Sequence, residues 1–403
     1  MLDQRVNAKV FLRMTSLKDI IKYRLGRNKD EYLDNFQGAI DLVNSHTHQF
    51  DDLQVHMIKG KAVYEVKTLA SLYYCRHINN LLRRLYKIKQ SDRDVITKQI
   101  HSLLKDTSPF FVIKGDITNF YESIDRSNII QKLKDDRLLD LRHINVIEKI
   151  FSNYNNDKGI PRGISFSSTL SELYLREFDD LIRRMPGIYY YARYVDDFII
   201  FAHDECIDID CVQKELSKFG LCINKTKTHK FISHLFYAKK QDITFLGYNH
   251  VVQNDSEVVV KISKKRIRKI KTRIVLAFLD FFKNKDIALI ELRLKFLTCN
   301  YVINTKQDER KRLLSGFYYN NCAITHFSQV NELDRFLMGI VKSKSGFIPK
   351  GISSKLKLKL IKIAKDNYFF KGFNSRVVHE IDADDFKKIK LCWEREYIYE
   401  KKK

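Results

Sequence analysis

Two adjacent acids inside an apolar stretch constrain this chain more than any other feature. The segment 189–202 reads YYYARYVDDFIIFA, so aromatic and β-branched residues lie on both sides of Asp196 and Asp197. Such residues favour strands, and two charges between two such runs favour a turn. We therefore expect a strand–turn–strand with both carboxylates at its tip. An acidic pair in a hairpin is most often an ordinary solvated turn, so the pair alone does not identify a site.

A third acid and a glycine-bracketed loop precede this hairpin. Asp116 lies at the end of the apolar run FFVIKGDI (110–117), which predicts a strand, and GIPRGISFSS (159–168) leads into a helical pattern over 167–184. Such a loop can bring backbone close to a ligand and a helix N-terminus close to phosphate. Carboxylates that converge from separate strands can hold two Mg²⁺ ions, the arrangement that transfers phosphoryl groups to a 3′-hydroxyl. The three acids are therefore the candidate metal site of a nucleotidyl transferase.

The charge balance indicates a polyanionic partner. The chain carries 73 Lys and Arg against 49 Asp and Glu, a net charge of +24, and such a field attracts nucleic acid. The segment 261–273 (KISKKRIRKIKTR) contains eight basic residues and no acid, on a pattern that predicts a helix. Codon bias towards Lys and a solvated helix face are the alternative explanations.

Other signals are absent from the sequence. The seven cysteines form no CxxC pair, no hydrophobic leader segment is visible, and no uncharged apolar run approaches the length of a membrane span. We therefore expect a reduced, soluble, cytoplasmic protein without a membrane partner. Apolar spacing predicts the remaining elements: mainly helices over 1–110, helices over 127–152 and 207–219, strands around 231–237 and 243–252, and helices from about 260 onward.

Five segments resemble motifs A to E of reverse transcriptases, in the order of that family. They are Asp116–Tyr121 (DITNFY), Ile160–Gly163 (IPRG) followed by Ser167, Tyr194–Asp197 (YVDD), Leu221–Asn224 (LCIN) running into Lys227, and Phe245–Tyr248 (FLGY). The resemblance implies an α+β chain with the right-hand polymerase fold, in which fingers, a palm with an antiparallel sheet and a helical thumb precede a helical C-terminal extension. The implied division is 1–109 for N-terminal helices and fingers, 110–255 for the palm, 256–310 for the basic thumb and 311–403 for the extension.

The resemblance also implies roles for residues of motifs A and C. Asp116 and Asp196 would bridge two Mg²⁺ ions (Mn²⁺ being an alternative in vitro), Asp197 would be a third carboxylate, and the carbonyl of Ile117 would complete one metal shell. Tyr121 would be a steric gate whose ring excludes a ribose 2′-hydroxyl and so selects dNTPs. An ordinary core tyrosine is the alternative at that position.

Motifs B, D and E and the flanking basic segments imply the remaining contacts. Arg162 and Gly163 would line the nascent base pair, Ser167 would lie on the template side, and Lys227 would protonate the leaving pyrophosphate unless it is a plain surface lysine. Family members hold the triphosphate with a basic pair on a fingers hairpin; the nearest such stretch is 84–94, with Arg93 as first choice and Lys87 as second. Primer and template would be held by the following residues: Phe245, Leu246, Gly247, Tyr248, Lys264, Lys265, Arg266 and Arg268.

Departures from the common pattern indicate a branch of the family. Arg162 stands where retroviral, retron and group II intron enzymes usually have Gln, and no endonuclease-like segment follows the thumb. With Tyr121-Glu122-Ser123-Ile124-Asp125 after motif A, the chain resembles bacterial abortive-infection and other defence-associated reverse transcriptases, including type-3 systems in which two such enzymes act together. This implies anti-phage DNA synthesis from dNTPs on an RNA template such as a dedicated non-coding RNA, with a second reverse transcriptase or a second copy as partner. Template-independent or protein-primed synthesis and a non-catalytic nucleic-acid-binding scaffold stay open as alternatives.

Overall fold

The computed structural model describes residues 2–394 except 46–47, 59, 107, 155–157, 254–256, 304–313 and 344–351. The chain divides into two compact units, one comprising 1–93 and 108–235, the other 94–107 and 236–403. Each unit has its own hydrophobic core. The mixture of helices and mainly antiparallel sheets confirms the expected α+β class.

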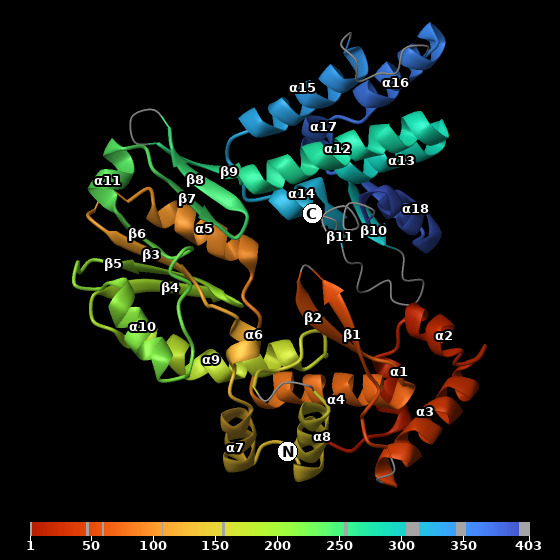
Figure 1. The fold of residues 1–403 in the computed structure, drawn as a ribbon, viewed down its shortest axis with the longest axis vertical. Helices are drawn as coiled ribbons and strands as arrows, with labels where there is room; N and C mark the ends of the chain where they lie inside the picture. Colours follow the sequence, from red (N-terminus) through yellow and green to blue (C-terminus); the bar gives the residue numbers. More distant parts are fainter. Residues whose placement is uncertain are drawn as a thin grey trace. The chain divides into compact units, whose positions relative to one another are not determined.

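A four-stranded antiparallel sheet lies at the centre of the first unit, with strand order β4-β5-β3-β6 (Figure 1). Its strands are β3 (Phe111–Asp116), β4 (Ile188–Tyr194), β5 (Asp197–Ala202) and β6 (His229–Ile232). After Asp197, every residue of β5 is buried, which explains its uninterrupted apolar sequence. The helices α9 (Ser167–Arg184) and α10 (Ile209–Ser217) pack against each other below this sheet in Figure 1, and α9 contacts β4.

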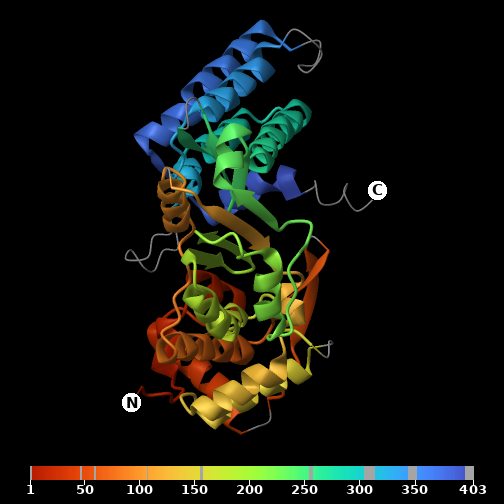
Figure 2. The ribbon, with the colours of Figure 1, turned by 90° about the vertical axis from the view of Figure 1, so that its left-hand side faces the viewer.

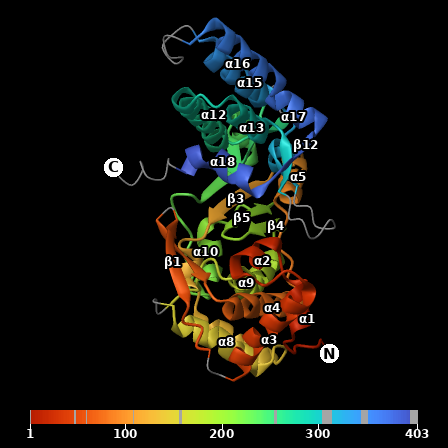
Figure 3. The ribbon, with the colours of Figure 1, turned by 90° about the vertical axis from the view of Figure 1, so that its right-hand side faces the viewer.

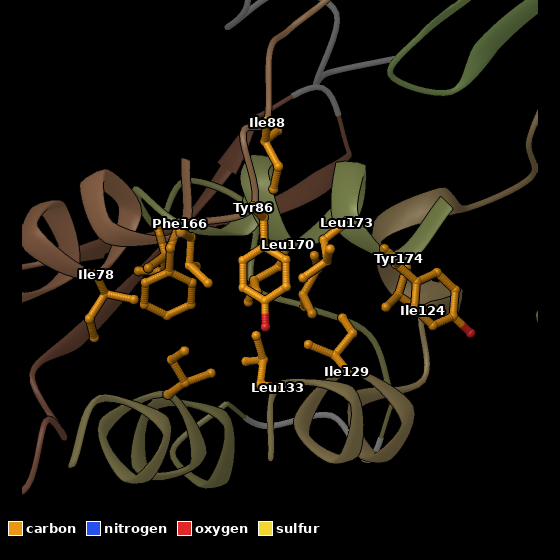
Figure 4. Close-up of a cluster of buried hydrophobic side chains, with 14 of the residues drawn as sticks. Ile78, Tyr86, Ile88, Ile124, Ile129, Leu133, Phe166, Leu170, Leu173 and Tyr174 are labelled. Carbon is orange, nitrogen blue, oxygen red and sulfur yellow. The ribbon is translucent and has the colours of Figure 1, made fainter. Parts of the chain in front are cut away.

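Helix α9 connects the sheet to the helical part of the first unit. Leu170, Leu173 and Phe178 recur at helical spacing and are buried, and α9 ends at Arg184, two residues before Pro186, as the residue before a proline disfavours helix. Figure 4 shows the layer in which α9 side chains meet those of neighbouring helices. Helices α7 (Arg126–Asp136) and α8 (Leu141–Ser152) lie side by side (Figures 1 and 2). The remaining helices of this unit are α1 (Ala8–Arg13), α2 (Leu17–Tyr23), α3 (Lys29–Asn44), α4 (Leu69–Leu85) and α6 (Phe120–Ser123).

The second unit combines two small sheets with helices. One sheet has the order β7-β8-β9, and the other, β11-β10-β12, includes one parallel pair. Helix α12 contacts α13 and α15, and α15 and α16 lie side by side (Figure 3). The strands are β7 (Asp242–Phe245), β8 (Tyr248–Val252), β9 (Val258–Ile262), β10 (Asn300–Ile303), β11 (Leu314–Gly316) and β12 (Val378–Ile381). The helices are α12 (Lys264–Asn284), α13 (Ile287–Thr298), α14 (Phe317–Asn321), α15 (Ser328–Lys342), α16 (Ser354–Asp366), α17 (Phe369–Ser375) and α18 (Ala383–Glu394); α5 (Arg93–Leu103) and α11 (Ser233–Ala238) begin at the boundaries between units.

Several expected elements were wrong. The N-terminal region is mainly helical as expected, but it also contains a hairpin that we did not expect, β1 (Leu53–Ile58) with β2 (Lys61–Val66). Residues 233–237, expected to continue a strand, form helix α11, because a short apolar run does not distinguish the two. The three strands β10, β11 and β12 interrupt the helices expected after residue 260. All seven cysteines are free thiols, and none of the helices that the structure describes is long and apolar enough to cross a bilayer.

Candidate active site

The hairpin that carries the acidic pair forms as expected. Strands β4 and β5 pair antiparallel, with Tyr194 opposite Asp197, so that Val195 and Asp196 form the turn. Val195 has φ of +61°, a conformation that is strained for a β-branched residue. Such strain persists only where surrounding contacts impose it, and it concentrates at functional sites.

A buried arginine supplies one of those contacts. Arg193 Nη1 donates to the Val195 carbonyl at 2.8 Å, while its other nitrogens bond the carboxylates of Asp179 (2.7 and 2.8 Å) and Glu172 (2.8 Å) on α9. Burial lowers the pKa of Arg193, but the bonds and charges of these acids raise it, and the net shift is upward. Sequence reasoning overlooked Arg193, although an arginine three residues before the acidic pair, in a strand of apolar residues, is itself a signal that a buried acid must exist.

The strand β3 brings the third acid to the hairpin tip. Asp116 lies directly opposite Asp197 in the β3–β5 register, and the next amide, of Ile117, donates to the Asp196 carbonyl at 3.0 Å. Burial, followed by the charges of Asp196 and Asp116, raises the pKa of Asp197 to about 6. Three carboxylates are thus gathered at one end of the sheet, and the charges of two of them disfavour the ionisation of Asp197.

The motif D segment is attached to the same strand end. Thr118 N donates to Cys222 O and Asn224 N to Asp116 O, both at 2.8 Å. Lys227, three residues further on, places Nζ 3.0 and 2.9 Å from the two carboxylate oxygens of Asp116, and this contact raises the Lys227 pKa. The structure therefore brings Lys227 into the acidic cluster, although 60% of its side chain is exposed.

The donor chemistry suits divalent cations. Carboxylate oxygens are the ligands that hard ions such as Mg²⁺ prefer, and an ion would favour the charged form of Asp197, whose pKa is raised by burial and by the neighbouring carboxylates. As the side chains lie, however, no group of three or more His, Cys, Asp or Glu among the described residues is arranged to hold a metal ion. Both oxygens of Asp116 are bonded to Lys227 instead, so a cation would compete with that ammonium group.

Motif B packs against the residues that follow motif A. The Arg162 guanidinium lies 4.5 Å from the centre of the Tyr121 ring and bonds both carboxylate oxygens of Glu122, at 2.7 and 3.0 Å. Burial raises the pKa of Tyr121. The hydroxyl of Ser167 donates to the Pro161 carbonyl at 2.6 Å and is buried, so as it lies it stabilises the loop; its predicted template contact stays a prediction.

The hairpin β1–β2 supports this loop from the N-terminal side. Tyr64 N donates to the Arg162 carbonyl at 2.6 Å, and Gly163, at φ of +97°, leaves no room for a Cβ beside the Tyr64 carbonyl oxygen. The stretch 84–94 is not a hairpin: it comprises the end of α4, a connection that includes Lys87 at φ of +51°, and the start of α5 at Arg93. The expected hairpin therefore does not lie in this stretch, and the triphosphate contacts of Arg93 and Lys87 stay predictions. Lys61, on β2, lies close enough to contribute to the lowered pKa of Glu122, after Arg162.

Motif E and the basic helix belong to the second unit. FLGY is the β7–β8 turn and not the middle of a strand: Phe245 pairs with Tyr248 while Leu246 and Gly247 have positive φ. Phe245 and Tyr248 are buried, and the Arg266 guanidinium lies over the Tyr248 ring. Arg266 also bonds the Asn320 carbonyl at 3.0 Å, whereas Lys264, Lys265 and Arg268 are exposed on α12.

The fold and this cluster define a class. An antiparallel palm sheet that presents two strand-end acids opposite each other, beside a glycine-bracketed loop and an aromatic residue, is the arrangement of a nucleotidyl-transferring polymerase. Residues 41–250, more than half of the chain, match the family described as Reverse transcriptase (RNA-dependent DNA polymerase). The chain belongs to this family, which confirms the right-hand polymerase fold expected from its motifs.

Similar solved structures are telomerases from two Candida species. Apo telomerase from Candida tropicalis is 14% identical over 86% of this chain and 66% of its own, with a TM-score of 0.38. The same telomerase with a fragment of telomeric RNA is 14% identical over 90% of this chain and 65% of its own, with a TM-score of 0.39. The RNA complex from Candida albicans is 15% identical over 79% of this chain and 53% of its own, with a TM-score of 0.33. The chain thus spans less than two thirds of the length of these proteins. A search of curated proteins returned no match.

Proposed function

We propose that this chain synthesises DNA from dNTPs on an RNA template, with two Mg²⁺ ions held by Asp116, Asp196 and Asp197. The observation that carries the proposal is the register of β3 against β5, which sets Asp116 opposite Asp197 at the end of the sheet. When bound, the ions would activate the primer 3′-hydroxyl and neutralise the leaving pyrophosphate. The raised pKa of Asp197 is the electrostatic cost that such ions would offset.

The side chains around the acids fit the remaining tasks. Tyr121, in α6 and five residues after Asp116, would exclude a ribose 2′-hydroxyl from the nucleotide site. Lys227, already in contact with the cluster, would donate a proton to the pyrophosphate once its bond to Asp116 is released. The exposed cations of α12 would attract the phosphate backbone of primer and template.

The test is primer extension by the purified protein on an RNA template. Wild-type protein should incorporate dNTPs in the presence of Mg²⁺, and Asp196→Asn should abolish incorporation. Asp180→Asn, on the exposed side of α9 where Asp180 pairs with Arg183, is a matched control that should retain it. Extension by the Asp196→Asn protein would refute the proposal, and better use of rNTPs than of dNTPs would point to an RNA polymerase.

We further propose that the enzyme acts in the bacterial cytoplasm in defence against phage. The support is the resemblance around motif A and the Arg at position 162. A dedicated non-coding RNA would be the template, and a second reverse transcriptase or a second copy the partner. Sequencing the nucleic acid that co-purifies with the protein tests this: a single enriched RNA with complementary DNA supports it, whereas DNA joined covalently to protein supports protein-primed synthesis.

A phage challenge separates catalysis from a scaffold role. Cells carrying the wild-type chain should survive infection better than cells carrying the Asp196→Asn variant. Equal protection by both would show that nucleic-acid binding without catalysis is sufficient.

A further inference from the structure

Glu122 directly follows Tyr121, the predicted steric gate, and pairs with Arg162, the arginine of motif B. Its two carboxylate oxygens accept bonds from Nε and Nη2 of Arg162 at 2.7 and 3.0 Å, a two-point contact that fixes the plane of the guanidinium. The side chains of Arg162 and Glu122 are 22% and 34% exposed, so solvent screens the pair less than an ion pair at the surface. The contact with Arg162 lowers the pKa of Glu122. Burial lowers the pKa of Arg162, but the hydrogen bond and charge of Glu122 raise it, and the net shift is upward.

The guanidinium of Arg162 lies over the ring of Tyr121. Arg162 Cζ is 4.5 Å from the centre of the Tyr121 ring, within the range of a cation–π contact. Nη1, the remaining guanidinium nitrogen, makes no hydrogen bond within the part of the chain that the structure describes. One face of the ring is therefore covered by a cation whose orientation a neighbouring carboxylate determines.

The backbone around this contact is held independently. Tyr64 N donates to the Arg162 carbonyl at 2.6 Å, and Ile160 N donates to the Tyr121 carbonyl at 2.8 Å. Arg126 Nε donates to the Gly159 carbonyl at 2.6 Å. Loss of the Glu122 contact would leave the loop in place and release only the side chain of Arg162. A change at Glu122 thus acts on side-chain orientation and not on the path of the chain.

We infer that Glu122 is a positioning residue for sugar selection: by holding Arg162 against Tyr121, it keeps the ring where a ribose 2′-hydroxyl would collide with it. The inference rests on the proposed polymerase function. A glutamine at position 162 would have neither a charge to pair with Glu122 nor a planar cation to lie on the ring. In this chain Arg162 and Glu122 therefore act together on the position of Tyr121.

The test compares dNTP and rNTP incorporation, as kcat/KM, for Glu122→Gln and Arg162→Gln. Both variants should lose about 10- to 100-fold of the preference for dNTPs, the range expected for a charge-assisted hydrogen bond, mainly because rNTP incorporation rises. If Glu122 acts through Arg162, the double variant should match Arg162→Gln alone. Glu148→Gln, which removes an equally short but more exposed ion pair with Lys134 in the same unit, should leave the preference unchanged.

Three results would overturn the inference. One is a Glu122→Gln protein that keeps the wild-type sugar preference, and another is a variant that loses dNTP and rNTP incorporation in equal proportion, because that pattern reports general damage to the site. The third is additive loss in the double variant, which would mean that Glu122 does not work through Arg162. Failure of the wild-type protein to incorporate any nucleotide would instead refute the polymerase proposal, and the inference with it.

Discussion

Replacing Asp197 by Asn should stabilise the metal-free protein at neutral and alkaline pH. The native structure raises the pKa of Asp197 to about 6, from an ordinary 3.8, because the carboxyl is largely buried beside Asp196 and Asp116. Between these two values the native state binds more protons than the unfolded state, so the free energy of unfolding falls as the pH rises through this window. Asn has the shape of the protonated carboxyl and carries no charge at any pH.

The magnitude follows from the pKa difference. A shift from 3.8 to about 6 corresponds to about 3 kcal/mol once both states are ionised, at pH 8. The advantage of Asn should decrease to about 1.5 kcal/mol at pH 5 and vanish near pH 3, where the carboxyl is protonated in both states.

Urea denaturation in EDTA at pH 3, 5 and 8 measures this difference. Hydrogen exchange of the amides paired between β3 and β5 restricts the readout to the sheet that carries the site. Added Mg²⁺ should reduce the difference, because it stabilises the wild-type site more than the variant. Asp180→Asn is the control for an Asp-to-Asn change on the surface. A variant that is less stable than wild type at pH 8 in EDTA, or a difference independent of pH, would refute the electrostatic account.

Two further predictions concern the support of the site, and a third concerns the binding of nucleic acid. Gly163→Ala should cost about 2–4 kcal/mol in urea denaturation, because its φ is positive and its Cβ would overlap the Tyr64 carbonyl, whereas Gly220→Ala, at positive φ in open space, should cost about 1 kcal/mol. Arg193→Met should lower the free energy of unfolding by about 3–5 kcal/mol and abolish primer extension. The reason is that Glu172 and Asp179 lose their ion-pair partner and the Val195 carbonyl loses its hydrogen bond. Unchanged stability would contradict this. The third prediction concerns three exposed cations of α12, Lys264, Lys265 and Arg268. Replacing all three by Ala should reduce the slope of log affinity for nucleic acid against log salt concentration by about two to three. An unchanged slope would exclude these cations from the interface.

Local pattern was sufficient for the elements that carry the acids. The strand at 111–116, the hairpin at 188–202 and the helix at 167–184 were each predicted within a few residues. Their apolar residues follow the period of the element and face the core, so burial and local preference agree. The order of the motifs then indicated the family to which the chain belongs.

Local pattern failed where burial and pattern disagree. In β1 the apolar residues Val55, Met57 and Ile58 are exposed, so this strand shows no buried face that would identify it, and the β1–β2 hairpin was missed. The stretch LQVHMIKGKAVYEV, two six-residue runs separated by the residue pair Lys-Gly, was the available signal. FLGY was placed inside a strand because its turn depends on Leu246 adopting a left-handed conformation, which its side chain does not predict.

The sequence by itself determined which three acids form the cluster, since each lies at the end of a strongly patterned strand. Only the tertiary structure decided how they meet: Asp116 faces Asp197, Lys227 bonds Asp116, and Arg193 anchors the hairpin turn. The carboxylate of Glu122 likewise reaches an arginine 40 positions away. The physical reason is that strand register and side-chain pairing are set by contacts between segments distant in the chain, where burial and charge are balanced over the whole unit rather than along one element.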